Sequence, residues 1–282
     1  VTRLIASESG ISSEKLRKGE LTDAEFSILH QHIGRLTNAP VYIDDAQVWP
    51  NLAAKSAQIR VKVGNITGKD GAGTLSAGGV TVPVRWGADG GAAMIDVPMP
   101  NATAWSEFNP ALQKLTVTLN GPDAADTRDL TFGMREIKTD GDDVRLNGEL
   151  LYFRGTHDGG GFPLTGYPAM DVATWKKIIG ICKEWGLNGM RFHSWCPPEA
   201  AYTAADEMGF YMQPECGMWN SFDAEGKMLA VLNDETARLL KAYGNHASIV
   251  MLASGNEPAG RYNEQLPIWD KKWRETDNRR LY

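Results

Sequence analysis

The segment DVATWKKIIGICKEWGLNGMRFHSWCPPEAAYTAADEMGFYMQ, residues 171–213, decides the fold prediction. Apolar residues recur at helical spacing over 172–185 and again over 198–208. Short apolar runs at 188–193 and 210–213 alternate with these stretches and are typical of buried strands. Strands that alternate with amphipathic helices indicate a parallel sheet covered by helices.

The alternation continues in both directions along the chain. Leu151–Arg154 predicts a strand upstream of the segment, and Ile249–Leu252 predicts one downstream. Helices are predicted at Asp234–Tyr243 and Leu266–Thr276. Four successive strand–helix units therefore predict a parallel sheet within residues 133–282.

Polar residues follow each predicted strand. They are Thr156, His157 and Asp158, then His193, Ser194 and Trp195, then Glu215, and finally Asn256 and Glu257. The carboxyl ends of parallel strands meet at one edge of a sheet, and in a (β/α)₈ barrel this edge carries the chemistry. We therefore expect the candidate site there.

Residues 48–132 have a different pattern. Apolar and polar residues alternate over 59–63, 80–84 and 115–119, with Gly, Asn, Asp and Pro between the runs. This pattern predicts an antiparallel sandwich. Gly68–Gly73 lacks the spacing of a phosphate-binding loop and lies between two strand patterns, so we interpret it as a hairpin turn.

Residues 1–47 predict a helix, a turn, a second helix and a strand. Ser12 begins one cap-like sequence, and Thr22 begins another with Glu25 at the capping-box position. Pro40–Asp45 then predicts a short buried strand.

Composition limits the function classes. The 282 residues include 29 Lys and Arg against 35 Asp and Glu, which gives a net charge of −6. An acidic chain has no general attraction for nucleic acid or anionic membranes, and no apolar run is long enough to predict a membrane-spanning helix. Cys182, Cys196 and Cys216 lack disulfide or metal spacing and are interpreted as small buried residues. No metal or cofactor is predicted.

Glu257 is the sharpest single candidate. It follows Asn256 at the end of a predicted strand. A carboxyl group half buried at that edge would have a raised pKa, which suits a general acid, and the neighbouring amide suits a sugar hydroxyl. The alternative is that this pair caps the following helix.

Arg191 and His193 lie on one predicted strand, and both point into one cavity only if the strand ends there. Arg191 is alternatively a buried charge paired with a carboxylate on a neighbouring strand. His193, Trp195 and Trp219 suit a sugar-sized pocket, because pyranose rings stack on indole faces. The alternative for His193 is an ordinary core or surface histidine.

Five stretches carry a family resemblance: Asn147-Gly148, Phe153–Thr156, Trp185–His193, Ala204–Gly209 and Asn245–Pro258. In these motifs the chain resembles glycoside hydrolase family 2, the β-galactosidases, β-glucuronidases and β-mannosidases. The resemblance covers roughly residues 48–282. It implies an immunoglobulin-like β-sandwich at 48–132, followed by the first half of a (β/α)₈ TIM barrel at 133–282.

The resemblance also implies roles for single residues. Glu257 matches the acid/base carboxylate, and Asn256 matches the residue that binds the sugar 2-hydroxyl. The remaining substrate-binding residues are then expected to be His193, Trp195, Glu215, Trp219, His157 and Asp158. The string Arg191–Trp195 departs from the commoner family form, and Leu252 stands where the family usually has Trp, so the shape of the subsite is open.

The family's retaining mechanism needs a second carboxylate about 5 Å from the acid/base. That nucleophile belongs to a later strand, around the seventh, whereas this sequence stops where the fifth should start. We therefore expect no nucleophile among these residues and an inactive polypeptide, truncated within its barrel. A non-catalytic carbohydrate-binding fragment is the alternative.

Residues 1–47 resemble a different family, the DnaB-type replicative helicases, in Leu4–Ser9, Leu16–Leu21 and Pro40–Asp45. Neither nucleotide-binding motif of that family is present. We interpret the chain as a chimera of two reading frames with a junction near Ala46–Trp49, and a real gene fusion is the alternative. A helicase fragment is a third possible function, and ATP binding would distinguish it.

The expected partner is a β-linked glycan or glycoside, with no nucleic acid and no membrane. The resemblance is compatible with a periplasmic or secreted bacterial parent. The sequence leaves the compartment, the oligomeric state and the identity of the sugar open.

Overall fold

The computed structural model describes residues 11, 15, 21–29, 40–122 and 124–282. This part of the chain divides into two compact units. The first unit holds Val61–Ile95, Val117–Arg128 and the described residues up to Ala46, and the second holds Gln47–Arg60, Asp96–Thr116 and Asp129–Tyr282. The strands of the β domain contribute residues to both units, whereas the parallel sheet and the helices that follow it in sequence belong to the second alone.

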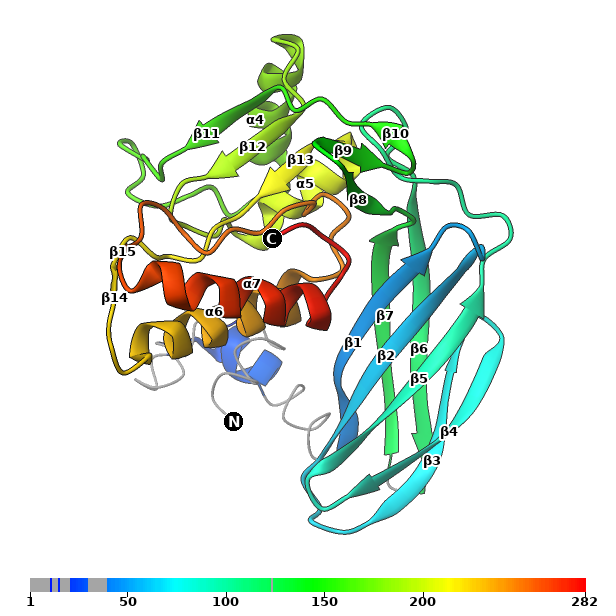
Figure 1. Cartoon of the computed structure of the whole chain (residues 1–282). Helices are drawn as coiled ribbons and strands as arrows, with labels where there is room; N and C mark the ends of the chain where they lie inside the picture. The colour runs from blue at the N-terminus through cyan, green and yellow to red at the C-terminus, as the bar shows by residue number, and fades with distance from the viewer. Residues whose placement is uncertain (1–10, 12–14, 16–20, 30–39, 123) are drawn as a thin grey trace. The chain divides into compact units, whose positions relative to one another are not determined.

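The β domain consists of seven long strands (Figure 1). They are β1 (Val41–Asn51), β2 (Ser56–Asn65), β3 (Gly71–Ala77), β4 (Val80–Gly87), β5 (Gly90–Pro98), β6 (Leu112–Gly121) and β7 (Ala124–Gly133). Their order is β1-β2-β5-β4-β3-β6-β7, and a parallel pair between Val41 and Ala124 closes the ring. An antiparallel β domain is thus confirmed, with the strands of the predicted sandwich joined into one ring.

The alternating pattern explains the core of this domain. In β2, Ile59, Val61 and Val63 are at most 3% exposed, whereas Arg60 and Lys62 face solvent. Successive residues of a strand point to opposite faces, so this alternation buries one apolar face. Each such side chain contributes roughly 1.5–3 kcal/mol to stability on burial.

The predicted hairpin at Gly68–Gly73 is wrong, because β2 and β3 are not neighbours. The Asn65 side-chain amide instead donates to the carbonyls of Lys69 and Gly87, at 2.8 and 2.7 Å. Its Oδ1 accepts from the backbone N–H of Thr67 at 2.9 Å. The turn therefore directs the chain from β2 to a strand elsewhere in the ring, an arrangement that strand periodicity does not reveal.

The predicted capping box at Thr22 is confirmed. The Thr22 backbone N–H donates to Glu25 Oε2 at 2.9 Å, and the Glu25 N–H donates to Thr22 Oγ1 at 3.3 Å. Residues 23–29 form the helix that follows. Hydrogen bonds from Lys15 and Thr22 lower the pKa of Glu25 to about 2.

The described part of residues 1–47 shows no clear helicase-like fold. The helix predicted from Ser12 and the motif at Leu4–Ser9 lie outside the described residues, apart from residue 15. The predicted strand at Pro40–Asp45 forms the start of β1, which runs without a break to Asn51. β1 therefore crosses the predicted junction at Ala46–Trp49, and the domain boundaries stay predictions.

A small antiparallel sheet follows the β domain. Its strands are β8 (Ile137–Asp140), β9 (Asp143–Leu146) and β10 (Glu149–Leu150), in the order β10-β9-β8. Asn147, in the left-handed region at φ +56°, accepts from the Glu136 N–H at 3.0 Å and donates to the Trp105 carbonyl at 3.0 Å.

The predicted parallel sheet is present. Its strands are β11 (Gly155–Asp158), β12 (Gly189–Phe192) and β13 (Tyr211–Gln213), and they run in one direction in Figure 1. Isolated parallel bridges extend it, from Met212 to Ile249, from Glu215 to Ala253 and from Met251 to Leu281. The described chain therefore places four strand positions side by side and begins a fifth at Leu281.

Helices cover this sheet. They are α4 (Val172–Glu184), α5 (Glu199–Met208), α6 (Lys227–Tyr243) and α7 (Tyr262–Thr276). Trp175 and Ile179 of α4 and Ala205 of α5 are buried against Phe192 and Met212 of the sheet. The first two helices thus match their predicted bounds within about one residue.

Three element starts differ from the prediction, and one of them is the start of α7 at Tyr262 rather than Leu266. The first strand begins at Gly155 rather than Leu151, because the Asn188 side chain takes up the Tyr152 carbonyl and the Arg154 N–H before pairing with β12 starts. The third helix begins at Lys227, where the Asp223 carboxylate accepts from the Lys227 N–H at 3.0 Å. Backbone hydrogen bonds of this kind lower the pKa of Asp223 to about 2.

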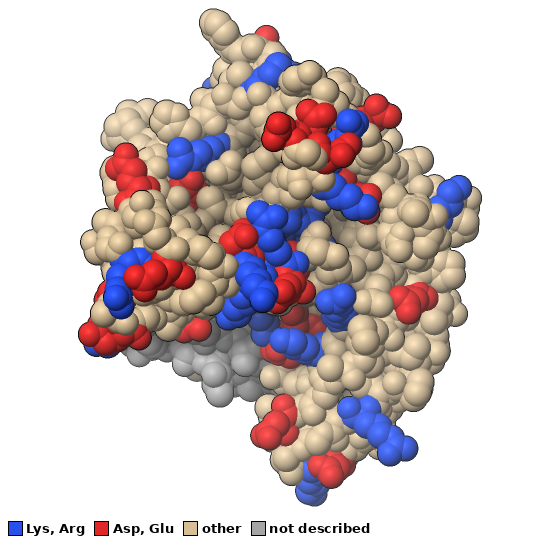
Figure 2. Space-filling model, viewed as in Figure 1, with Lys and Arg blue, Asp and Glu red and all other residues tan. Residues whose placement is uncertain are grey.

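The outer faces of α6 and α7 are charged. Figure 2 shows acidic and basic side chains interspersed over these helices. Arg274 pairs with Asp270 along α7 at 2.8 Å, and Arg238 pairs with Glu235 along α6 at 2.8 Å. Pairs at these spacings are typical of solvent-facing helices. Within the described ranges, no helix is both long and apolar enough to cross a membrane.

Candidate active site

The parallel strands bring predicted site residues level with one another. His157 of β11 lies opposite Arg191 of β12, which lies opposite Gln213 of β13. Side chains at one register level of neighbouring parallel strands share a face. His157, Arg191 and Gln213 therefore share one face of the sheet, and Asp158 and Phe192 share the other.

Glu215 lies just past β13, and its side chain is only 1% exposed. One carboxylate oxygen accepts from Arg191 Nε at 2.5 Å, and the other accepts from the Ser194 backbone N–H at 2.7 Å. A carboxylate so deeply buried needs such partners, because an unpaired buried charge is strongly unfavourable. Both oxygens are thus engaged within the protein.

Arg191 joins this carboxylate to the predicted sugar-binding amide. Its Nη2 donates to Asn256 Oδ1 at 2.8 Å, while its side chain stays 37% exposed. Arg191 is therefore paired with a carboxylate beside the neighbouring strand, as the alternative interpretation held, but it is not the buried charge that this interpretation expected. The same residue also reaches the candidate site.

Asn256 and Glu257 lie on a tight loop beyond the fourth strand position. Gly255 has φ +148°, and a side chain there would collide with the Met218 carbonyl, which accepts from the Asn256 N–H at 2.9 Å. Glu257 has φ +42° and is exposed. The expectation of a half-buried Glu257 is wrong, because the loop turns this carboxylate away from the strand toward solvent.

A shallow pocket opens beside this loop. It is lined by Met218, Asn220, Phe222, Ser254, Gly255, Asn256 and Pro258. The short parallel pair β14 (Ser221–Phe222) and β15 (Ala259–Gly260) joins its two sides. Asn256 is thus one of the polar groups in the pocket wall.

Three aromatic rings, those of His157, His193 and Trp219, lie next to one another at the strand ends. The His157 and His193 ring centroids are 6.2 Å apart, and the His193 and Trp219 centroids are 5.2 Å apart with the rings edge to face. Trp219 is 57% exposed, which leaves much of its indole free to contact a ligand.

Asp158 and Trp195 are held together on another part of this edge. The indole N–H of Trp195 donates to the Asp158 carbonyl at 2.9 Å, and Asp158 Oδ1 accepts from the Gly160 N–H at 2.7 Å. Phe162 packs edge to face on Trp195 with centroids 5.5 Å apart. These contacts fix the loop after β11.

The predicted residues thus fall into three groups: Glu215 with Asn256 through Arg191, His157 with His193 and Trp219, and Asp158 with Trp195. Glu257 follows Asn256 in sequence, and among the described residues no side chain hydrogen-bonds to it. The sequence placed Ser194 at this edge, but it did not predict the contact of the Ser194 backbone, at φ +60°, with Glu215. No sequence pattern marks that contact.

Cys196 and Cys216, which lie next to site residues in the sequence, are unreactive thiols. Burial raises the pKa of Cys196 to about 11 and that of Cys216 to about 12, so both stay protonated thiols at neutral pH. In the part of the chain that the structure describes, no three His, Cys, Asp or Glu side chains are grouped to hold a metal ion.

Family models match nearly the whole chain. Residues 137–282 match the model described as glycosyl hydrolases family 2, TIM barrel domain, and residues 41–135 match the model described as glycosyl hydrolases family 2. Residues 1–72 match the DnaB-like helicase C terminal domain, so residues 41–72 are shared by two models.

Among curated proteins, the chain is similar to Beta-galactosidase 2 of Enterobacter cloacae. The two are 25% identical over 187 residues, which is 63% of this chain and 18% of that protein. The chain therefore corresponds to a small part of this relative's length.

Solved structures share the fold. A GH2 β-galacturonidase from Eisenbergiella tayi bound to galacturonate has a TM-score of 0.76 at 22% identity, over 86% of this chain and 46% of that one. The β-glucuronidase of Parabacteroides merdae has a TM-score of 0.65 at 19% identity, over 86% of this chain and 33% of that one. At these identities the likeness shows the fold alone.

Proposed function

The chain belongs to glycosyl hydrolase family 2, and from this premise we propose that residues 48–282 carry the acid/base half of a retaining exo-β-glycosidase site. Glu257 is the proposed acid/base, and Asn256 the proposed ligand of the sugar 2-hydroxyl. The observation that carries the proposal is the anchoring of Asn256 to Arg191 at the carboxyl edge of the parallel sheet, with Glu257 next in sequence. This edge is where barrel enzymes place their chemistry.

Glu257 lacks the half-burial that the sequence analysis expected of a general acid, but its exposure makes it accessible to a glycoside. A general acid must reach the leaving oxygen of a glycoside that enters from solvent, and the Glu257 carboxyl is open to solvent. The loop that carries it is held to Met218 through the Asn256 N–H. A bound glycoside would then lie between this carboxyl and the ring line of His157, His193 and Trp219.

A retaining mechanism also needs a nucleophile about 5 Å from the acid. Among the described residues, the carboxylates of the neighbouring strand ends are engaged: Glu215 is buried between Arg191 and Ser194, and Asp158 Oδ1 accepts from Gly160. We propose that a polypeptide of residues 1–282 binds glycoside without hydrolysing it.

Chromogenic β-galactosides, β-glucuronides and β-mannosides test the proposed inactivity. We expect no nitrophenol release by the 282-residue polypeptide above its buffer control. Release that disappears in Glu257→Gln would overturn the proposed inactivity and would require a nucleophile from another chain.

The acid/base role is tested by binding. A glycosylamine carries a basic nitrogen in place of the glycosidic oxygen and would pair with the Glu257 carboxylate. By calorimetry, we expect wild type to bind it several-fold more tightly than the methyl glycoside, and Glu257→Gln to lose that preference. An unchanged preference in the variant would remove Glu257 from the role.

A second candidate is carbohydrate binding without any catalytic role, which the exposed face of Trp219 favours. It predicts that the methyl glycoside and the glycosylamine bind equally well. A helicase role is not proposed, since residues 41–65, within the helicase match, form β1 and β2 of the β ring.

A further inference from the structure

We infer that Glu215 and Arg191 are positioning residues, which orient the Asn256 amide with its NH₂ group toward the ligand, and that Glu215 does not itself bind sugar. This inference rests on the proposed function, because it concerns the same site. It assigns new roles to Glu215, predicted from sequence as a substrate ligand, and to Arg191.

The Glu215 carboxylate is buried and hydrogen-bonded within the protein. Its side chain is 1% exposed, and its two oxygens accept from Arg191 Nε at 2.5 Å and from the Ser194 N–H at 2.7 Å. Because the side chain is almost completely buried, neither oxygen is accessible to a sugar hydroxyl. Glu215 therefore acts on a ligand only through the groups that it holds.

Arg191 fixes the orientation of the Asn256 amide, because arginine can only donate hydrogen bonds. A guanidinium has five N–H donors and no acceptor, so the Asn256 atom facing Arg191 Nη2 at 2.8 Å must be the amide oxygen. The flipped amide would set two donors against each other. Among the described residues nothing accepts from Asn256 Nδ2, so its two N–H groups are free for a ligand acceptor.

Glu215 also holds the turn that carries two ring residues. Ser194 lies between His193 and Trp195 and has φ +60°, a left-handed conformation that residues other than glycine rarely adopt. The Ser194 N–H is the group that donates to Glu215. One buried carboxylate thus sets both the amide orientation and the turn between His193 and Trp195.

The test compares Glu215→Gln with a matched control, Glu107→Gln. Glu107 also receives an arginine, Arg154 Nη2 at 3.1 Å, and an asparagine amide, Asn188 Nδ2 at 3.1 Å. Arg154 precedes β11, so this pair lies at the opposite edge of the parallel sheet. Circular dichroism and thermal unfolding establish that both variants are folded.

The first readout is calorimetry with methyl β-galactoside or methyl β-glucuronide, whichever binds wild type, and with its 2-deoxy analogue. We expect wild type and Glu107→Gln to prefer the hydroxylated ligand about tenfold, and Glu215→Gln to prefer it less than twofold. A retained tenfold preference in folded Glu215→Gln would overturn the inference.

The second readout needs no sugar. The side-chain amide signals of Asn256 in a ¹⁵N–¹H spectrum are identified by their loss in Asn256→Ser. We expect them to shift or broaden in Glu215→Gln and Arg191→Lys but not in Glu107→Gln, and unchanged signals would overturn the inference. Failure of wild type to bind any glycoside would refute the proposed function, and this readout would then decide the positioning role alone.

Discussion

Two arginine–carboxylate clusters lie at opposite ends of the parallel strands in the larger unit. The cluster around Glu215 lies at the carboxyl ends. The cluster around Asp277 lies at the amino ends, close to Asn245 and Ala247, which precede the fourth strand position. Both use the same chemistry, yet only the Glu215 cluster has an arginine that reaches solvent, whereas Nε and Nη1 of Arg280 in the Asp277 cluster are buried without a partner.

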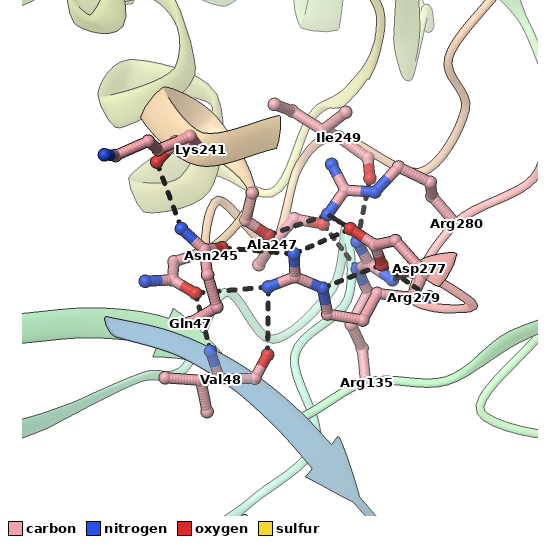
Figure 3. A network of polar contacts seen from close by, with 11 residues as sticks. Gln47, Val48, Arg135, Lys241, Asn245, Ala247, Ile249, Asp277, Arg279 and Arg280 are labelled. Atoms are coloured by element: carbon pink, nitrogen blue, oxygen red, sulfur yellow. Dashed lines mark hydrogen bonds and ion pairs between the residues drawn. The ribbon is translucent and has the colours of Figure 1, made fainter. Parts of the chain in front are cut away.

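The Asp277 cluster consists of Asp277, Arg279, Arg280 and Arg135, which are all buried. Figure 3 shows their polar contacts. Arg279 donates to both oxygens of Asp277, at 2.8 and 2.7 Å, and to the Val48 carbonyl of β1 at 3.1 Å. Arg135, just past β7, donates to the carbonyls of Ala247 and Ile249 at 2.6 and 2.8 Å. These bonds join Arg279 to β1 and Arg135 to residues 247–249, in each case across a long distance in sequence.

The difference lies in what remains for a ligand. The Arg279 and Asp277 side chains are 6% and 4% exposed, and their polar atoms bond to protein. Arg191 is 37% exposed, and the Asn256 NH₂ beside it is free among the described residues. An arginine–carboxylate pair therefore indicates stability where its surroundings are closed, and a site where one partner reaches solvent.

The largest expected effect is on the buried cluster. Asp277→Asn removes the carboxylate that contacts Arg279 and Arg280, at 2.7 and 3.5 Å, and leaves their buried charges uncompensated. Breaking a buried pair from one side costs about 3–5 kcal/mol. We expect a loss of this size in the free energy of unfolding, measured by urea denaturation.

Asp270→Asn is the matched control, because Asp270 pairs with Arg274 on the exposed face of α7. Exposed pairs contribute about 0–1 kcal/mol. Equal losses of stability in the two variants would show that burial does not strengthen the contribution of the Asp277 pair.

A smaller effect is expected at the site cluster. Glu215→Gln keeps the shape of the side chain but weakens its bonds with Arg191 and Ser194. Because Arg191 is 37% exposed, water compensates part of the loss, and we expect about 1–3 kcal/mol of destabilisation in urea. A cost equal to that of Asp277→Asn would make Glu215 chiefly a stabilising residue.

The Asp277 cluster also predicts acid sensitivity. Burial opposes ionisation of Asp277, but the charges of Arg280 and Arg279 outweigh it and hold the pKa of Asp277 well below its ordinary value. The folded state thus binds fewer protons than the unfolded state below about pH 4, and this carboxyl costs up to about 1.4 kcal/mol of stability for each pH unit below that. Its contribution is fully present above about pH 4.

Urea unfolding between pH 7 and pH 3 measures this dependence. Burial lowers the pKa of the neighbouring Arg135 to about 9 and raises the pKa of Tyr282, so neither group changes charge in that range. We expect the loss below pH 4 to be smaller in Asp277→Asn than in wild type. Parallel curves for the two proteins would contradict the assigned pKa direction.

Periodicity predicted much of this fold. The helix predicted at 172–185 is α4, and the alternation of Ile59, Val61 and Val63 marks a buried strand face. The strand predicted at Leu151–Arg154 failed because Tyr152 and Phe153 are apolar yet exposed, at 69% and 40%. Apolar character locates buried strands only where tertiary packing covers them.

The candidate site was less predictable. Residue type and position after a strand placed Asn256 and Glu215 at one edge, but pairing through Arg191 depends on register, which sequence does not state. Glu257 is exposed on a loop where Gly255 has φ +148° and Glu257 itself has φ +42°, and Ser194 makes its contact from a left-handed backbone. Such conformations are set by the fold around them.

The smallest expected effect on stability, and the sharpest on function, is at Trp219. Its indole is 57% exposed and meets the edge of His193 at the carboxyl end of the sheet. Trp219→Ala should lower the free energy of unfolding by about 1 kcal/mol, because more than half of the residue is exposed in the folded state. Loss of a stacking face should weaken glycoside binding about fivefold in calorimetry, equivalent to about 1 kcal/mol.

Trp185 provides the control, because it is 81% exposed but lies at the end of α4 and not at the strand ends. Its alanine variant should bind glycoside as wild type does. If both variants lost affinity equally, the position of Trp219 at the strand ends would not explain its role in binding. The contrast between the two clusters would then rest on stability alone.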